Sequence, residues 1–211
     1  LSNVFLHYAL DEWFEQEIKP RMKGRCFLSR FADDFVIGFE LESDARRVMD
    51  VLPKRFNRFG LTIHPTKTAL IEFGRPHREQ TSGKGKDTFD FLGFTHYWAR
   101  SRRGYWIIKR KTKCAKMHAA MKAIWKWCKH NRHRPIKEQW KKLCQKLRGH
   151  YQYFGIRNNS RSMEVYRWYT ERAWMHWLGH RHRNGNISWE KFERQYQESF
   201  PLPRPRIVHN V

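Results

Sequence analysis

The stretch Phe31-Ala32-Asp33-Asp34 lies between two apolar runs, Cys26–Arg30 and Phe35–Phe39. The runs contain aromatic and β-branched residues, which favour strands, whereas Asp is common in tight turns. The pattern therefore predicts a β-hairpin with two adjacent carboxylates at its tip. Asp in such a turn often has only a local role. However, neighbouring like charges repel, so we expect a cation opposite them, and carboxylate oxygens suit a divalent metal near phosphates.

The overall composition predicts a globular protein that binds a polyanion. The chain has 211 residues, of which 40% are hydrophobic, enough for one large or two small domains. Its net charge of +23 makes a compact state repel itself, which a bound polyanion relieves. Nucleic acid is the first candidate and an anionic membrane surface the second. No apolar run is long enough to span a bilayer, and Leu1 begins no signal-peptide pattern, so we expect no membrane partner.

The cysteines form no C-x-x-C pair, and we interpret them as reduced core thiols of a cytoplasmic protein. They are Cys26, Cys114, Cys128 and Cys144. His180 and His182 are close in sequence, but no carboxylate or Cys accompanies them, which disfavours a metal site there.

Helical spacing of apolar residues predicts two helices around the acidic hairpin. The first covers residues 1–19 and stops at Pro20. The second begins at an N-cap on Ser43 and ends at Gly60, with Pro53 as a kink or break.

Further strands are predicted after the second helix. Residues 61–73 show a strand, turn and strand pattern with Lys67 in the turn, where a solvated loop lysine is the alternative. A polar loop is expected over 74–87, followed by an apolar run at 89–95. In this run, Gly93 indicates a tight bend or a close approach of backbone to a ligand.

The composition changes near residue 100, which divides the chain into two parts. We expect an N-terminal domain at 1–98, a linker at 99–110, a helical domain at 111–203 and a tail at 204–211. The fold class is therefore α+β. The predicted helices of the second domain contain Met117–Cys128, Pro135–Tyr151, Asn159–Trp177 and Ser188–Tyr196. In the third of these, Trp168 and Trp174 are expected to point away from the apolar face.

Aromatic stripes at helical spacing usually belong to a core. A core role does not explain the basic residues beside these aromatic residues. Structured RNA would explain both, because its phosphates bind cations and its unpaired bases stack on exposed planar side chains. The candidate RNA-binding residues are Lys109, Arg110, Lys113, Lys141, Lys142, Arg157, Arg161, Arg167 and Arg172.

Three motifs in order resemble the last three palm blocks of a reverse transcriptase. They are Phe31–Asp34, Gly60–Thr68 and Phe91–Phe94. The later segments Gly149–Gly155 and Pro201–Arg206 resemble the thumb, or maturase domain X, of a group II intron-encoded protein. The resemblance covers almost the whole chain and predicts a partial polymerase palm followed by an all-α thumb bundle.

The resemblance implies RNA-directed DNA polymerisation with two Mg²⁺ ions, in which Asp33 binds metal directly and Asp34 lies in or near that shell. Lys67 would neutralise or protonate the pyrophosphate, and Leu92-Gly93 would hold the primer end. The helices would grip an RNA template with its DNA primer, or group II intron RNA. Deoxynucleoside triphosphates would be substrates.

Two features that the resemblance would require are absent from this sequence: an earlier strand with another metal-binding Asp, and a Gln-Gly segment beneath the nucleotide. Leu1–His7 resembles the residues after that segment, so we expect the C-terminal half of a reverse transcriptase, ending before any zinc-bearing endonuclease domain. Its N-terminal half would be a partner. Two functions stay open: part of a polymerase, or an inactive RNA-binding splicing (maturase) fragment. An unrelated basic nucleic-acid-binding protein is a third alternative.

Overall fold

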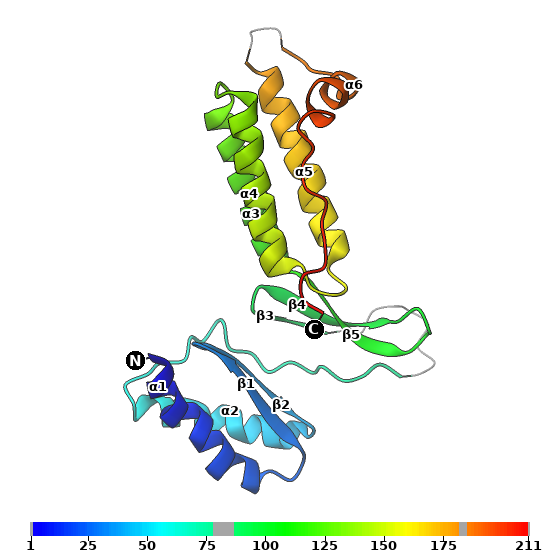
Figure 1. Cartoon of the computed structure of the whole chain (residues 1–211). Coiled ribbons are helices and arrows are strands. Elements are labelled where there is room, and N and C mark those ends of the chain that lie inside the picture. The colour runs from blue at the N-terminus through cyan, green and yellow to red at the C-terminus, as the bar shows by residue number, and fades with distance from the viewer. Residues whose placement is uncertain (1, 78–86, 182–184, 211) are drawn as a thin grey trace. The chain divides into compact units, whose positions relative to one another are not determined.

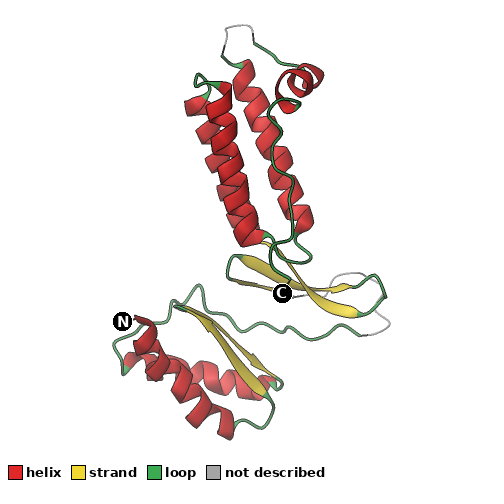
Figure 2. Cartoon of the chain, viewed as in Figure 1, coloured by secondary structure: helices red, strands yellow, loops and turns green. Residues whose placement is uncertain are grey.

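The computed structural model describes residues 2–77, 87–181 and 185–210. The chain forms two compact units (Figure 1). Unit 1 contains Leu1–Leu92 and Tyr97–Trp106, and unit 2 contains Gly93–His96 and Ile107–Val211. Unit 1 combines helices with strands, whereas three helices of 18, 19 and 20 residues dominate unit 2 (Figure 2). The predicted α+β class is confirmed. Within the described part of the chain, no helix is long and apolar enough to cross a membrane.

The helix predicted over residues 1–19 is a helical run of four pieces. They are α1 (Ser2–Leu6), η1 (His7–Glu12), η2 (Phe14–Ile18) and η3 (Lys19–Arg21). The middle two are π-helical. Pro20 lies inside the final 3₁₀ turn and not after the run. Proline is tolerated at the start of a turn because the backbone N–H groups there have no hydrogen-bond partner within the helix, so the missing N–H of proline costs nothing. Leu10, Trp13, Phe14 and Ile18 are buried, as their spacing predicted.

The acidic hairpin is confirmed. Strands β1 (Cys26–Phe31) and β2 (Asp34–Phe39) pair antiparallel, with Phe31 opposite Asp34 and Cys26 opposite Phe39. The loop is therefore Ala32-Asp33, and Asp34 is the first residue of β2. The inner face of the hairpin packs on the unit 1 core, together with the N-terminal helical run and the next helix.

Helix α2 (Glu42–Asn57) begins before Ser43, so the predicted N-cap is wrong. Leu41 occupies the N-cap position. The start of the helix is connected to the preceding chain by Asp44, whose buried carboxylate accepts hydrogen bonds from the backbone N–H groups of Lys23 and Gly24 at 2.9 Å each. Pro53 lies within the helix and does not split it. Its buried face packs against the core, and each large apolar side chain buried there contributes roughly 1.5–3 kcal/mol.

The two strands predicted in residues 61–73 are wrong, because this segment has no β-ladder partner and forms no regular structure. Leu61 and Ile63 contact the unit 1 core through side chains alone. The turn between the predicted strands is confirmed, since the carbonyl of His64 accepts the N–H groups of Lys67 and Thr68 at 3.2 Å each. The predicted polar loop at 74–87 lies mainly outside the described residues.

The apolar run at 89–95 forms a second hairpin. The strands are β3 (Thr88–Phe91), β4 (Phe94–Arg100) and β5 (Trp106–Thr112), in the order β3-β4-β5. Leu92 and Gly93 both have positive φ, at 49° and 77°, as a two-residue hairpin turn of type I′ requires. The segment predicted as a linker, 99–110, contains the end of β4 and the first part of β5.

Unit 2 contains the four predicted helices. They are α3 (Cys114–Asn131), α4 (Ile136–Phe154), α5 (Ser160–Gly179) and α6 (Trp189–Phe192), with η4 (Glu193–Gln197) continuing α6. Ser188 caps α6, accepting the N–H of Lys191 at 3.3 Å. Asn159 precedes α5, but its buried side chain bonds Thr112 instead of capping the helix.

The C-terminal segment runs back along the helices of unit 2 (Figure 1). The Trp140 indole donates to the carbonyl of Pro201 at 2.9 Å, and the Tyr151 hydroxyl donates to that of Pro203 at 3.2 Å. Further on, the N–H of Val208 donates to Gly155 at 2.7 Å. This segment is therefore part of the fold of unit 2.

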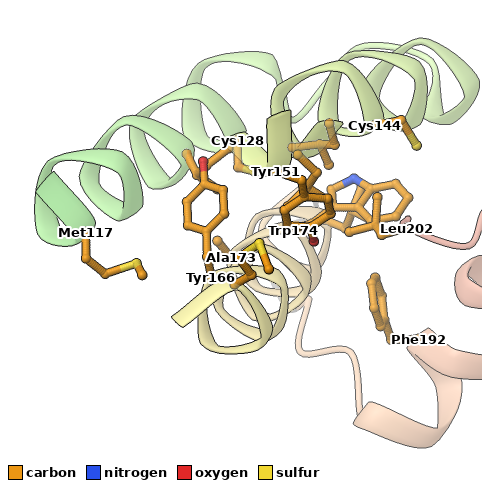
Figure 3. Close-up of a cluster of buried hydrophobic side chains, with 14 residues drawn as sticks. Met117, Cys128, Cys144, Tyr151, Tyr166, Ala173, Trp174, Phe192 and Leu202 are labelled. Carbon is orange, nitrogen blue, oxygen red and sulfur yellow. The ribbon is translucent and has the colours of Figure 1, made fainter. Parts of the chain in front are cut away.

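The prediction that Trp174 points away from the core is wrong. Its side chain is fully buried among the apolar residues of the unit 2 core (Figure 3). Its indole donates to Gln139 at 3.0 Å. Phe192 meets it edge to face, with ring centroids 5.6 Å apart. The reason is that α6 and the C-terminal segment cover a second face of α5. Trp168 is 51% exposed, as expected.

All four cysteines are free. Cys128 and Cys144 are buried and Cys26 is half-buried, as expected of core thiols. Burial raises the pKa of Cys128 to about 12, so this thiol stays protonated. Cys114 is exposed at the start of α3, so the core prediction is wrong for it.

Candidate metal and nucleic-acid binding residues

The tip of the acidic hairpin is a strained two-residue turn. Ala32 has a φ of 54°, which costs a non-glycine residue roughly 1 kcal/mol or more. The Arg30 guanidinium supports this turn by donating to the carbonyl of Ala32 at 2.8 Å. Asp33 and Asp34 are both exposed at the tip, so their carboxylates are open to a cation.

Arg30 also joins the hairpin to the N-terminal helical run. Its Nε and Nη2 donate to the two carboxylate oxygens of Asp11 at 2.8 and 2.6 Å. Two parallel hydrogen bonds between the same two groups fix the orientation of the guanidinium relative to the carboxylate. The hydrogen bond from Arg30 holds the pKa of Asp11 below its usual value, although burial acts in the opposite direction. One guanidinium therefore orients both the turn and the strand that leads into it.

Sequence reasoning missed Arg30 and Asp11, although a signal was present. Arg30 follows Cys26 and Leu28 at alternate positions of β1, on the side that faces the core. A basic side chain on such a face requires an acidic partner. The sequence could thus have predicted a partner, but not that it would be Asp11.

The fit of the tip to a divalent metal is partial. Asp33 and Asp34 supply the hard oxygen ligands that Mg²⁺ prefers. Among the described residues, no group of three or more His, Cys, Asp or Glu side chains lies together as a metal site. A metal held at the tip would therefore need ligands from water, substrate or another segment.

The other predicted catalytic and primer-binding residues lie in two further turns. Lys67 is exposed in the turn after His64, and Leu92 and Gly93 form the loop between β3 and β4. A Cβ on Gly93 would meet its nearest neighbours, Tyr153 and Phe154, at 3.7 Å, an ordinary contact. The positive φ therefore explains the glycine, and the expected tight bend is confirmed.

Most predicted RNA-binding side chains are accessible. Lys141, Lys142, Arg157, Arg161 and Arg172 are exposed, and Lys109, Arg110 and Lys113 are half-buried. The Arg172 guanidinium lies 4.8 Å from the ring centroid of the exposed Trp168. This pair presents a cation and a planar surface together.

Arg167 differs from the others because it pairs with a buried carboxylate. Its Nη2 lies 2.6 Å from Oε1 of Glu171, whose residue is only 5% exposed. Burial raises the pKa of Glu171, and the charge of Arg167 opposes that rise. The contacts of Arg167 therefore give it a role in the fold.

A basic hollow that the sequence did not predict lies between α4 and the C-terminal segment. It has a volume of about 270 Å³. Its lining includes three arginines, Arg148, Arg204 and Arg206. Guanidinium groups bind phosphate oxygens in a fixed fork geometry, so the hollow suits a phosphate group. The sequence could not indicate it because the arginines come together only through the docked C-terminal segment.

Replacement of Arg167 by Ala should destabilise the protein by roughly 2 kcal/mol at pH 7, because it leaves the buried Glu171 carboxylate without its partner. Arg172→Ala is the matched control and should cost less than about 1 kcal/mol. Urea unfolding measures both.

The pH dependence gives the Arg167 prediction a second test. The folded-state pKa of Glu171 is raised, so the stability from this group is present at low pH and is lost as pH rises through that pKa. The loss of unfolding free energy caused by Arg167→Ala should therefore be smaller below about pH 4.3, where Glu171 is protonated in both the folded and the unfolded protein. Equal losses for the two variants at pH 7 would contradict the assignment.

The chain was also compared with known proteins. The model of the family described as Reverse transcriptase (RNA-dependent DNA polymerase) matches residues 1–96, somewhat less than half of the 211 residues. No curated protein and no solved structure matches the chain. The matched region contains the acidic hairpin, Lys67 and the turn at Leu92-Gly93. Residues 1–96 are therefore similar to a reverse transcriptase domain, the enzyme class that copies RNA into DNA.

Proposed function

We propose that this chain is the C-terminal part of a group II intron reverse transcriptase and maturase. In this role it contributes Asp33 and Asp34 to RNA-directed DNA polymerisation and binds RNA through unit 2. The observation that carries the proposal is the acidic hairpin itself, an exposed pair of carboxylates on a braced turn inside the region that matches the reverse transcriptase family.

The residues of the chain have distinct tasks in the proposed reaction. Asp33 would hold a magnesium ion directly, and Asp34 would lie in or near the same shell. Bound magnesium ions would activate the attacking 3′ hydroxyl and stabilise the charge on the leaving pyrophosphate. Lys67 neutralises or protonates that pyrophosphate, and the turn at Leu92-Gly93 holds the primer end. Arg30 keeps the tip oriented through its hydrogen bonds to Asp11 and Ala32.

This part of the site is not sufficient for the reaction. Two-metal displacement requires ligands for two ions roughly 4 Å apart. Two carboxylates on adjacent residues cannot surround both ions, and Mg²⁺ gives up its water reluctantly. In the proposal, a segment with a further carboxylate completes the site together with the deoxynucleoside triphosphate.

Unit 2 supplies the RNA-binding part of the proposal. It carries the exposed cations described above and the hollow lined by Arg148, Arg204 and Arg206. The partners are an RNA template with a DNA primer and, for the maturase role, group II intron RNA. A cytoplasmic location with reduced thiols belongs to the same proposal.

A splicing factor without polymerase activity is the second candidate function. The specific observation in its favour is that no group of three or more metal-ligating side chains lies together in the described part of the chain, whereas a basic surface needs no metal to bind RNA. Primer extension separates the two functions.

We expect residues 1–211 alone to show no primer extension on an RNA template. Addition of a reverse transcriptase N-terminal half with the further carboxylate should restore it, because the ligand set is then complete. Asp33→Ala should abolish the restored activity, and Lys67→Ala should reduce it less. Asp50→Ala, which changes an exposed carboxylate on α2, is the control and should leave activity unchanged. Robust extension by residues 1–211 alone would contradict this part of the proposal, and failure to restore activity would favour the splicing factor.

RNA binding should depend strongly on salt. If about 6 to 10 phosphates are contacted, affinity should fall roughly 10³- to 10⁵-fold between 50 and 200 mM salt. Filter binding measures this response, and the triple change of Arg148, Arg204 and Arg206 to Gln should make the slope shallower. The same change at Lys23, Lys54 and Arg58 of unit 1 is the control of equal charge. A flat salt response of the unchanged protein would show the RNA-binding proposal wrong.

A further inference from the structure

We infer that a groove on α3 and α5 receives one unpaired RNA base, which stacks on Trp125. This inference rests on the proposed RNA binding by unit 2 and assigns that binding a specific site.

The groove is an open hollow of about 400 Å³. Small-molecule pockets have volumes of about 300–1,000 Å³, so this hollow has room for a planar base. It is lined by His118, Met121, Lys122, Trp125 and Tyr169. The lining combines planar and flexible apolar side chains with one lysine, a composition that suits an aromatic ligand with an attached anion.

The Trp125 indole is held firmly although it is 36% exposed. The ring centroid of His176 lies 4.8 Å from that of Trp125 at an interplanar angle of 31°, and Trp177 meets the indole edge to face at 5.4 Å. His180 stacks behind His176 at 4.2 Å. The indole therefore forms part of a layered aromatic cluster, which fixes its orientation before any ligand arrives and reduces the entropy lost on binding.

The charges around this cluster favour an anionic ligand. Helix α3 contains four lysines and no Asp or Glu. Lys122 lines the groove, and Lys129 and Arg132 lie 5.6 and 5.9 Å from the ring centroid of Trp177. A second copy of this chain would bring another strongly positive surface against the first, since each chain has a net charge of +23.

An RNA base with its phosphates satisfies both features of the groove. Each base has an apolar face that stacks on an aromatic side chain, and its flanking phosphates are attracted by Lys122 and by the other lysines of α3. In a duplex both faces of each base are already stacked, so the groove selects a base in a single strand, loop or bulge. The same site would then favour folded intron RNA over a plain duplex.

The test compares two single-stranded RNAs of twelve nucleotides and identical phosphate number. One carries bases throughout, and the other has abasic residues at its central positions. Trp125→Ala should weaken binding of the base-bearing RNA by roughly 5- to 150-fold, the loss expected for one stacked base. Binding of the abasic RNA should change less than about twofold, because its contacts are electrostatic.

Trp189→Ala is the matched control, because Trp189 is 38% exposed in the same unit but lies outside the groove. It should leave the affinity for both RNAs unchanged. Trp125→Phe keeps a ring on the cluster and should retain part of the preference for bases. Near-ultraviolet circular dichroism of each variant shows whether the fold is intact.

A crosslinking experiment on the unchanged protein gives an answer even if Trp125→Ala does not fold. Single-stranded RNA with 5-iodouridine should crosslink to the peptide that contains Trp125, identified by mass spectrometry. Crosslinks confined to other peptides would overturn the inference.

Other outcomes distinguish the failure of the inference from the failure of the proposed function. Equal affinity of the unchanged protein for both RNAs, with a steep salt response, would overturn base stacking and leave RNA binding standing. No affinity for either RNA at low salt would overturn both. A concentration-dependent dimer in sedimentation velocity that Trp125→Ala dissociates would assign the groove to a second copy and overturn the inference.

Discussion

The paired hydrogen bonds between Arg30 and Asp11 determine how the acidic tip is presented. Arg30 lies on the inner side of β1, where an unpaired guanidinium beside the core would be costly. Asp11 satisfies it with two short hydrogen bonds, and a third bond reaches the carbonyl of Ala32 in the strained turn. The exposed carboxylates of Asp33 and Asp34 therefore stand on a turn that is connected to the N-terminal helical run. This connection makes the tip a candidate catalytic element and not only a loop between strands.

Unit 2 depends on a different constraint, the docking of the C-terminal segment. Leu202 is buried in the core, and the neighbouring carbonyls accept hydrogen bonds from Trp140 and Tyr151. The docked segment helps to cover Trp174 and places Arg204 and Arg206 beside Arg148. The same packing that completes the core therefore assembles a basic hollow on the surface of unit 2.

Local periodicity was enough to predict the acidic hairpin and the four helices of unit 2, because residues close in sequence define these elements. It failed where distant segments decide the environment. Trp174 was assigned to the wrong face because the residues that cover it come from other segments, α6 and the C-terminal segment, which the spacing within α5 does not reveal. The strands predicted in 61–73 do not form because a strand needs a ladder partner, which no single segment can specify.

The residues of the candidate site could likewise be predicted only where residues close in sequence define their surroundings. Asp33, Asp34 and Lys67 were visible as residue types in expected turns, but the partner of Arg30 was not. The structural role of Arg167 could have been anticipated, since Glu171 follows four residues later on the same helix and such pairs face one another. What the sequence could not supply was the burial of Glu171, which changes an ordinary surface pair into a structural one.

We propose that Asp33 and Asp34 form part of a divalent metal site that another carboxylate completes. Electron paramagnetic resonance of added Mn²⁺ tests this directly, because Mn²⁺ accepts the same oxygen ligands as Mg²⁺. The account predicts weak Mn²⁺ binding by the chain alone. It predicts tight binding once the complementary segment, an RNA template with its primer and a deoxynucleoside triphosphate are added, with loss in Asp33→Ala and no loss in Asp50→Ala. Equally tight binding by Asp33→Ala in the complete assembly would contradict it.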